Sequence, residues 1–426
     1  MRAWRFVHAF VLVGVLCAGG PGVLRAEEAP SGAKLIDELH RKAFLWFQAN
    51  RHPRSGQVLD RAPKREGGQR GRMASIAATG YFLSLLPDWV RAGWVTEAEA
   101  RGQAMTTLAF AQRMPHHRGL LYHFQDWETG ERWGKSEVSA LDSAIFFNGC
   151  MVVAEAFGGE VAERANALID RAEWSAFLMR HPKSAKELLS LGWRPESGLL
   201  YPADVRSSEM AMPYFLAAGS RTHPIPSGRW YDTDVVRGEL GGVRVLNPTH
   251  PLFTSYYGLG WHDLKGRVDR EGVDLWANAR AAALANRNVC RALAEKHRTY
   301  RPEAGGWWGL SAGDSPAGYV APNPLVGDRD GTVWPVAALA ALPWMAELEE
   351  EVVKWHGSGH WGEVNGRHGL SPFTLDKDWV GPDLLGIDLG SFGVSVANHR
   401  RRTVWELWMR HPVAKSALER LEVRSQ

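Results

Sequence analysis

The sequence predicts a mainly α-helical protein whose helices close into a ring, an (α/α) toroid, with long loops that form a groove at one rim. Apolar residues recur at helical spacing in one segment after another, whereas the alternating runs typical of β-strands are scarce. No βαβ rhythm is found, which excludes a parallel-sheet architecture. No fixed repeat period of the solenoid kind is found either, and this favours the closed ring. The long segments between helices are of the kind that carries functional residues.

The first helix is predicted over residues 34–49, where Ile36 and Leu39 begin an apolar face. A second helix starts near residue 73 and is expected to stop at Pro87. Thr96 and Glu99 form a capping box that starts the third. Residues 219–251 are predicted to be mostly loop. Further helices are predicted, in chain order, over residues 142–157, 162–179, 183–191, 207–218, 274–297, 333–353, 386–398 and 411–423.

The amino-terminal residues have the pattern of a secretory signal peptide. Arg2 and Arg5 give a basic start, residues 11–16 continue an apolar run, and Ala26 offers a small residue for cleavage. We therefore predict a signal peptide over residues 1–26, a single domain over residues 27–426, and a periplasmic or secreted protein. No later stretch is long and apolar enough to predict stable insertion into a membrane.

The net charge of the chain limits the kinds of partner that it is expected to bind. Removal of residues 1–26 leaves 47 basic residues against 47 acidic ones, and this neutral balance argues against a dedicated nucleic-acid binder.

Two cysteines, Cys150 and Cys290, remain after residue 26, either as one disulfide or as two buried thiols. The chain has no His-Glu-x-x-His or Cys-x-x-Cys motif, and we predict neither a metal nor a cofactor. A monomer is expected.

The most informative stretch is residues 122–147, which mixes carboxylates with aromatic side chains. Sugar rings stack on flat apolar faces, and glycosidic cleavage uses a pair of carboxyl groups, so the mixture is typical of a saccharide site. The alternative is a solvated charged loop that caps a helix. The residues concerned are Tyr122, His123, Asp126, Trp127, Glu128, Glu131, Trp133, Glu137 and Asp142.

Isolated acids also stand at the start of later apolar helices. Glu209 follows Ser207 and Ser208, and Asp388 lies between Ile387 and Leu389. A carboxyl group that is partly desolvated in such a place has a raised pKa, as a general acid requires. Asp330, before the helix predicted from residue 333, is a similar candidate. The alternative for each is a capping carboxylate on free backbone amides.

Ser311 lies in a Gly-x-Ser-x-Gly motif, residues 309–313, that matches the nucleophile elbow of serine esterases. That motif requires a preceding strand and a following helix. Gly-Gly-Trp-Trp precedes it here, and Asp314 and Ser315 lead into Pro316. A serine esterase is therefore the less favoured alternative.

Taken together, these segments resemble the bacterial glucoamylase-like family that contains the endo-β-1,2-glucanases of glycoside hydrolase family 144. The resemblance covers nearly the whole chain after residue 26. It rests on the shared order of several pieces: Ser-Ile-Ala-Ala-Thr-Gly-Tyr at 75–81, Gly-Leu-Leu-Tyr-His-Phe at 119–124, Glu-Val-Ser-Ala-Leu-Asp at 137–142, Ser-Glu-Met at 208–210, Gly-Ser-Arg-Thr-His-Pro at 219–224, Ala-Arg-Ala at 279–281, Trp-Gly-Leu-Ser-Ala-Gly-Asp at 308–314, Asp-Gly-Thr at 330–332 and Gly-Ile-Asp at 386–388.

The resemblance implies an (α/α)6 barrel and hydrolysis of a β-linked glucan, best known as β-1,2-glucan, by an inverting route. Glu209 matches the family's favoured acid. Two departures bear on the substrate: Ser371 and Thr374 stand where the family has an acid and an amide, and His399 replaces a tyrosine. A catalytically silent glycan-binding protein of the same fold is therefore the main alternative.

As a hypothesis, Glu209 protonates the departing oxygen, and the base that activates water is Asp142, Glu137 or Asp126. A larger set is expected to bind the oligo- or polysaccharide through stacking or through its hydroxyl groups. These residues are Tyr122, His123, Trp127, Arg280, Trp308, Asp314, Tyr319, Asp330 and Asp388.

Overall fold

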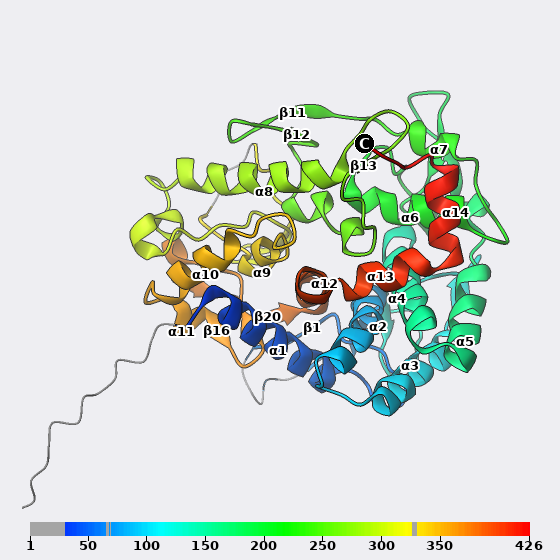
Figure 1. The fold of residues 1–426 in the computed structure, drawn as a ribbon, viewed down its shortest axis with the longest axis horizontal. Helices are drawn as coiled ribbons and strands as arrows, with labels where there is room; N and C mark the ends of the chain where they lie inside the picture. Colours follow the sequence, from blue (N-terminus) through cyan, green and yellow to red (C-terminus); the bar gives the residue numbers. More distant parts are fainter. Residues whose placement is uncertain (1–29, 65–67, 69, 326–329) are drawn as a thin grey trace, which may run out of the picture. The chain divides into compact units, whose positions relative to one another are not determined.

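The computed structural model describes residues 30–64, 68, 70–325 and 330–426, so the predicted signal peptide lies outside the described residues. Residues Ser31–Gln426 group into one unit that is mainly helical (Figure 1). Its α-helices are α1 Gly32–Asn50, α2 Ile76–Arg91, α3 Glu97–Ala111, α4 Ala140–Phe157, α5 Gly159–Asp170, α6 Ser208–Gly219, α7 Gly228–Tyr231, α8 Leu275–Ala292, α9 Pro335–Leu339, α10 Leu348–His356, α11 Trp361–Val364, α12 Gly386–Arg401, α13 Thr403–Arg410 and α14 Pro412–Arg420.

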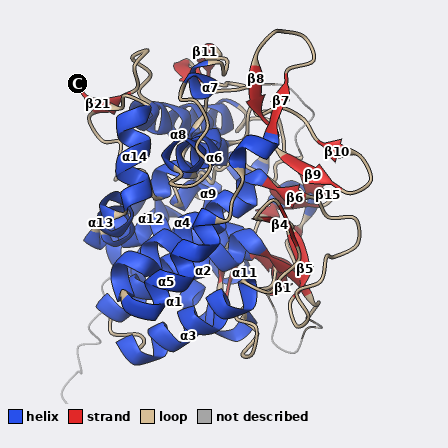
Figure 2. Cartoon of the chain, turned by 90° about the vertical axis from the view of Figure 1, so that its right-hand side faces the viewer, coloured by secondary structure: helices blue, strands red, loops and turns tan. Residues whose placement is uncertain are grey.

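The strands are short and pair as antiparallel ladders, most of them two-stranded. Figure 2 shows most of them gathered on one side of this unit, with the helices on the other. They are β1 Arg61–Pro63, β2 Met73–Ser75, β3 His116–His117, β4 Leu120–Leu121, β5 Phe124–Asp126, β6 Val138–Ser139, β7 Leu178–Arg180, β8 Glu187–Leu189, β9 Gly192–Arg194, β10 Gly198–Leu199, β11 Arg237–Leu240, β12 Val243–Leu246, β13 Arg267–Val268, β14 Gly313–Ser315, β15 Gly318–Val320, β16 Asn365–Gly366, β17 Gly369–Leu370, β18 Phe373–Thr374, β19 Trp379–Val380, β20 Asp383–Leu385 and β21 Arg424–Ser425.

Three helices begin directly where a short strand ends. β2 runs into α2, β6 into α4 and β20 into α12. Ser75 and Ser139 cap α2 and α4 by accepting a hydrogen bond from a backbone amide of the first turn, and Ser207 does the same for α6. The helix starts therefore lie on the side that carries the strands, and the first-turn side chains project there.

The predicted helices are confirmed in most places, including the capping box of Thr96 and Glu99. Pro87 does not stop the second helix, which continues to Arg91 because its buried residues hold the chain around the proline. The helix predicted over 333–353 is broken after Leu339, where Pro343 cannot donate a backbone hydrogen bond. The prediction over 162–191 is only partly right: α5 ends at Asp170, and residues 178–189 form the β7–β8 hairpin.

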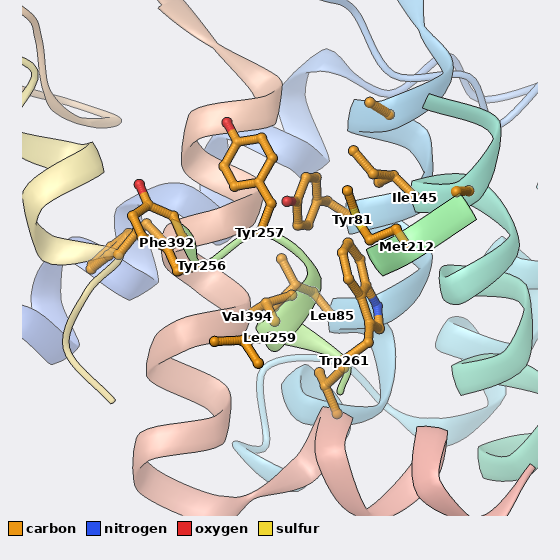
Figure 3. Close-up of a cluster of buried hydrophobic side chains, with 14 of the residues drawn as sticks. Tyr81, Leu85, Ile145, Met212, Tyr256, Tyr257, Leu259, Trp261, Phe392 and Val394 are labelled. Atoms are coloured by element: carbon orange, nitrogen blue, oxygen red, sulfur yellow. The ribbon is translucent and has the colours of Figure 1, made fainter. Parts of the chain in front are cut away.

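The core lies between α2, α4, α6 and α12, and Figure 1 shows α12 beside α1, α2, α9 and α13. Tyr81 of α2 stacks on Trp261 with ring centroids 5.0 Å apart, and the indole N–H of Trp261 donates to Ser84 Oγ at 2.9 Å. Figure 3 shows Ile145 and Met212 beside this pair. Aromatic side chains therefore fill the interior between the helices.

Among the described helices, α4 alone is long and apolar enough to cross a membrane, and 83% of it is buried inside the fold. It is the central core helix of this unit. Cys150, on α4, is a buried free thiol, so it does not form the disulfide with Cys290 that the sequence left open.

Helices α2 and α4 approach most closely at Gly80 and Gly149. A Cβ atom on Gly80 would stand 2.5 Å from the Cα atom of Phe146 and 2.6 Å from the carbonyl oxygen of Ile145. We expect Gly80→Ala to lower the free energy of unfolding by about 1–3 kcal/mol, because the helices must separate. Urea denaturation measures the change.

The control is Gly102→Ala on the exposed side of α3, where a Cβ atom meets nothing within 4 Å. Alanine favours a helix interior over glycine, so this variant should gain about 0.5–1 kcal/mol. Equal stability of the two variants would show that the close approach of α2 and α4 is not required.

Candidate active site

A cavity of about 690 Å³ opens where α4, α6 and α12 begin. Ile145, Met212 and Tyr257, which Figure 3 shows in the core, also line its wall. Its defining feature is a concentration of five carboxyl groups from four separate segments of the chain. These are Asp60, Glu137, Asp142, Glu209 and Asp388.

Three of these carboxylates belong to the first turns of helices. Asp142, Glu209 and Asp388 follow the N-termini of α4, α6 and α12. Free backbone amides at a helix start favour a negative charge nearby. Asp142 Oδ2 accepts a hydrogen bond from the hydroxyl of Ser139, the residue that caps α4, at 2.5 Å. Glu209 and Asp388 instead accept no side-chain hydrogen bond from a described residue and face the cavity.

Glu209 is the carboxyl group best suited to donate a proton. It is reached from the cavity but is otherwise surrounded by protein, and burial raises its pKa to about 8, with the negative charge of Asp142 adding to the effect. The group is therefore protonated at neutral pH, as a general acid must be. The raised pKa predicted from its apolar surroundings is present.

Asp388 is the second carboxyl group in the cavity whose pKa is raised. Burial and the nearby charges of Asp60 and Asp314 raise it to about 7, against the opposing effect of Arg61. Like-charged neighbours disfavour ionisation. Asp388 is thus divided between its charged and neutral forms near neutrality.

His123 lies between the carboxyl groups of Glu137 and Asp142. Its Nδ1 is 3.0 Å from Glu137 Oε1, and its Nε2 is 3.5 Å from Asp142 Oδ1. Burial alone would lower the pKa of His123, but Asp142, Glu137 and Asp60 outweigh burial and raise it to about 9. In turn, the hydrogen bond from His123 holds the pKa of Glu137 at about 2. The imidazolium therefore keeps Glu137 charged, whereas Glu209 is neutral.

Arg61 and Asp60 enter the site from β1, and sequence reasoning missed them because they appeared only as a loop pair. Arg61 donates to Asp60 Oδ2 at 3.0 Å and to both carboxylate oxygens of Asp314 at 2.9 Å. The predicted binding residue Asp314 therefore holds Arg61, which lines the cavity. The one signal was an adjacent acid and base inside a Pro- and Gly-containing loop.

Aromatic side chains stand exposed at the cavity. Tyr319, a predicted binding residue on β15, is 59% exposed, and Tyr201 is 77% exposed. Exposed aromatic faces beside a cavity are surfaces on which sugar rings can stack. Tyr201 was not predicted as a site residue, because nothing in its loop marks it.

The structure does not bring the other predicted site residues into the cavity lining. Asp126 is bound by Arg72 and by two backbone amides, which, against burial, hold its pKa at about 2. It cannot readily serve as a base there. Arg280 instead pairs with Glu347 at 2.8 Å, and the buried Trp308 donates its N–H to Glu351 at 2.5 Å.

Three further predicted residues also take local partners. Trp127 packs against His52 with ring centroids 5.1 Å apart. Asp330 accepts from the backbone amide and hydroxyl of Thr332, and it does not cap α9, whose N-cap residue is Trp334. Tyr122 lies under the guanidinium of Arg132 at 5.3 Å.

Ser311, Ser371 and Thr374 are not among the described residues that line this cavity. Ser311 is 1% exposed, and its motif leads into β14 rather than into a helix, which argues against the esterase alternative. Ser371 is buried, and the Thr374 hydroxyl donates to the carbonyl oxygen of Asp330 at 2.7 Å.

Comparison with known proteins shows what this chain is similar to. The model of the family described as "Putative glucoamylase" matches residues 203–412. A curated relative, the exo-β-1,2-glucooligosaccharide sophorohydrolase (non-reducing end) of Parabacteroides distasonis, is 23% identical over 91% of this chain. The chain spans 58% of that relative's length.

Solved structures show the same fold. One described as a putative glucoamylase, from Bacteroides caccae, has a TM-score of 0.84 and 23% identity and covers 93% of this chain and 100% of its own. The endo-β-1,2-glucanase of Chitinophaga pinensis, in complex with sophorotriose and glucose, has a TM-score of 0.83 and 23% identity, covering 93% and 99%. The predicted resemblance to the glucoamylase-like family is thereby confirmed.

Proposed function

Because this chain resembles the glucoamylase-like family in sequence and in fold, we propose that it is a glycoside hydrolase that cleaves a β-linked glucan, most specifically β-1,2-glucan. The observation that carries the proposal is the opposed protonation of the carboxyl groups in one cavity. Glu209 is neutral at pH 7, whereas Glu137 is ionised. A neutral acid and an ionised carboxylate facing the same space are what glycosidic cleavage requires.

In the proposed mechanism, Glu209 gives its proton to the glycosidic oxygen as the bond from that oxygen to the anomeric carbon breaks. Water attacks the anomeric carbon from the opposite face and passes its proton to a carboxylate, which inverts the configuration. We assign the base to Asp142. Both oxygens of Glu137 are engaged, by His123 and Arg194, and its pKa of about 2 makes it a weak base.

His123 has a positioning role in this scheme. By contacting both Glu137 and Asp142 it fixes the orientation of the two carboxyl groups, and its hydrogen bond keeps Glu137 charged. Tyr201 and Tyr319 supply exposed faces on which glucosyl rings stack. These contacts are how the chain would bind an oligo- or polysaccharide.

We also propose where the protein acts and how its domain is built. Residues 1–26 direct export to the periplasm or out of the cell, and residues 27–426 act as a monomeric (α/α)6 barrel with the cavity at one rim. The helical unit 31–426 and the likeness to solved glucoamylase-like structures support the barrel.

Product analysis tests the reaction and the linkage together. The protein is incubated with linear β-1,2-glucan and, separately, with β-1,3-, β-1,4- and β-1,6-glucans and starch. Short oligosaccharides from β-1,2-glucan alone are expected. Tight binding of β-1,2-glucan without any product would favour the silent glycan-binding protein instead.

The activity should decline on the alkaline side with an apparent pKa near 8. Burial raises the pKa of Glu209 to about 8, so the free enzyme loses its acid above that pH. We expect kcat/KM for β-1,2-glucan to fall about tenfold per pH unit above 8. A profile that stays flat to pH 10 would contradict the assignment of Glu209 as the acid.

A further inference from the structure

A second, larger cavity of about 950 Å³ lies beside β1, β18, β19 and β20 and has no part in the mechanism above. We call it the Trp379 cavity. Trp379, on β19, presents a partly exposed indole to it, and that indole N–H donates no hydrogen bond to a described residue. Its described polar lining consists of Lys64, Arg298, His360, Glu363, Thr374, Asp378 and Asp383.

The lining fits a neutral, hydroxyl-rich ligand. Lys64 and Arg298 are balanced by Glu363, Asp378 and Asp383, so no single charge dominates. Asp383 is half-buried, and its carboxylate accepts no hydrogen bond from a described residue. In the described part of the cavity, an aromatic face beside one free indole N–H and one free carboxylate is a combination that suits a sugar ring.

The Trp379 cavity adjoins the catalytic cavity along one two-stranded ribbon. In the pairing of β1 with β20, Arg61 stands opposite Leu385, and both line the catalytic cavity. Two residues further along, Pro63 stands opposite Asp383, and both line the Trp379 cavity. Two residues of strand span about 7 Å, so one bound glucan chain can reach both cavities.

From this placement we infer that the Trp379 cavity is a distal binding site for glucosyl units of the same glucan chain that the catalytic cavity cleaves. The inference rests on the proposed function. A distal glucosyl site accounts for the partly exposed tryptophan and for the Asp383 carboxylate that accepts no hydrogen bond from a described residue. Its consequence is a dependence on chain length: long glucans fill both cavities, whereas a short oligosaccharide fills the catalytic cavity alone.

Steady-state kinetics of Trp379→Ala on long linear β-1,2-glucan and on a β-1,2-linked oligosaccharide of three or four units test the inference. With the long glucan, KM should rise about threefold to tenfold with kcat unchanged, because stacking on an aromatic face is lost equally from the ground state and the transition state. With the short substrate, both constants should stay as in the wild type. Trp379→Phe, which keeps a flat face, should restore most of the affinity for the long glucan.

The matched control is Trp133→Ala, which removes an indole of 39% exposure that lines neither cavity. It should leave KM for both substrates unchanged. An equal effect of Trp379→Ala on long and short substrates, or no effect on either, would overturn the inference.

Calorimetric titration of β-1,2-glucan into Glu209→Gln, with and without Trp379→Ala, separates the two proposals. Absence of hydrolysis by the wild type would count against the proposed function. Weaker binding caused by Trp379→Ala in this titration would still support the distal site, and unchanged binding would refute it.

Discussion

Replacement of Glu209 by glutamine is expected to lower kcat on β-1,2-glucan about a thousandfold, within the ~10²–10⁴-fold range that general acid catalysis contributes. Glutamine has the same shape but no proton that it can transfer to the glycosidic oxygen. KM should change little, because the neutral amide resembles the protonated carboxyl group that faces the cavity at neutral pH. Rates of product formation measure both constants.

The same variant should be more stable than the wild type at alkaline pH. The pKa of Glu209 is about 8 in the folded protein, against 4.5 for an unperturbed glutamate, so between those values the folded state binds the proton more tightly than the unfolded chain does. Stability contributed by this group is therefore present below about pH 4.5 and is lost as the pH rises towards 8. Glutamine does not titrate, so the Tm of Glu209→Gln should exceed that of the wild type at pH 8 but not at pH 4.

Glu303→Gln, at an exposed site outside the cavity, is the control and should change neither kcat nor Tm. A Glu209→Gln variant that folds and still hydrolyses the glucan at the wild-type rate would contradict the assignment. Loss of activity with a lower Tm at both pH values would instead indicate a structural role.

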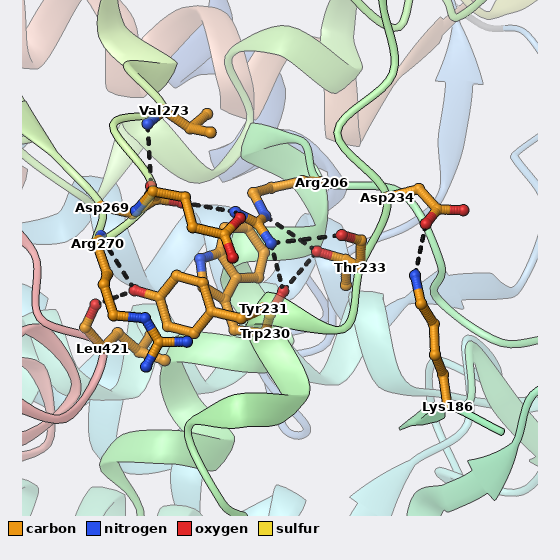
Figure 4. Close-up of polar contacts among 11 residues, drawn as sticks. Lys186, Arg206, Trp230, Tyr231, Thr233, Asp234, Asp269, Arg270, Val273 and Leu421 are labelled. Atoms are coloured by element: carbon orange, nitrogen blue, oxygen red, sulfur yellow. Dashed lines mark hydrogen bonds and ion pairs between the residues drawn. The ribbon is translucent and has the colours of Figure 1, made fainter.

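Replacement of Arg206 by methionine should destabilise the fold by about 3–5 kcal/mol. The Arg206 side chain is fully buried and donates to Thr233, to Asp269 at 3.1 Å and to Glu271 at 2.6 Å, as Figure 4 shows in part. Methionine fills much of the volume but leaves the buried carboxylate of Asp269 without its cation. An unpaired buried charge is what makes breaking such a pair costly.

Replacement of Arg206 should also disturb the position of Glu209 and so lower kcat. Arg206 directly precedes Ser207, which caps α6, and Glu209 lies in the first turn of that helix. Urea denaturation gives the change in stability, and activity at low temperature, where the variant remains folded, gives the change in kcat.

Lys186→Met is the matched control, because Lys186 pairs with Asp234 at 2.6 Å at the surface (Figure 4). Exposed ion pairs contribute about 0–1 kcal/mol, so this variant should remain near wild-type stability. Equal losses from the two substitutions would show that burial of Arg206 does not matter.

The sequence predicted the helical class and the carboxylates that lie at helix starts. Asp142, Glu209 and Asp388 could be found because an acid in an apolar helix start is a local pattern, visible without knowledge of the fold. His123 was found for a related reason, since it lies 14 residues before Glu137 within the same acidic and aromatic stretch.

The rest of the site depends on contacts that are distant in sequence. Arg61 meets Asp314 across 253 residues, and nothing local to either predicts the pair. Arg280 and Trp308 were predicted from residue type, but their polar groups are satisfied by Glu347 and Glu351, on or beside α10. Residue type alone also does not tell a tryptophan that binds a sugar from one that fills the space between helices, as Trp261 does.

The central claim is that this chain hydrolyses β-1,2-glucan by inversion, with Glu209 as the acid and Asp142 as the base. Proton NMR of the reaction, recorded before the product anomers equilibrate, tests the claim most directly. The claim predicts that the α-anomer appears first at the newly formed reducing end and that Glu209→Gln produces neither anomer at a comparable rate. First appearance of the β-anomer, or no new reducing end from folded wild-type protein, would contradict it.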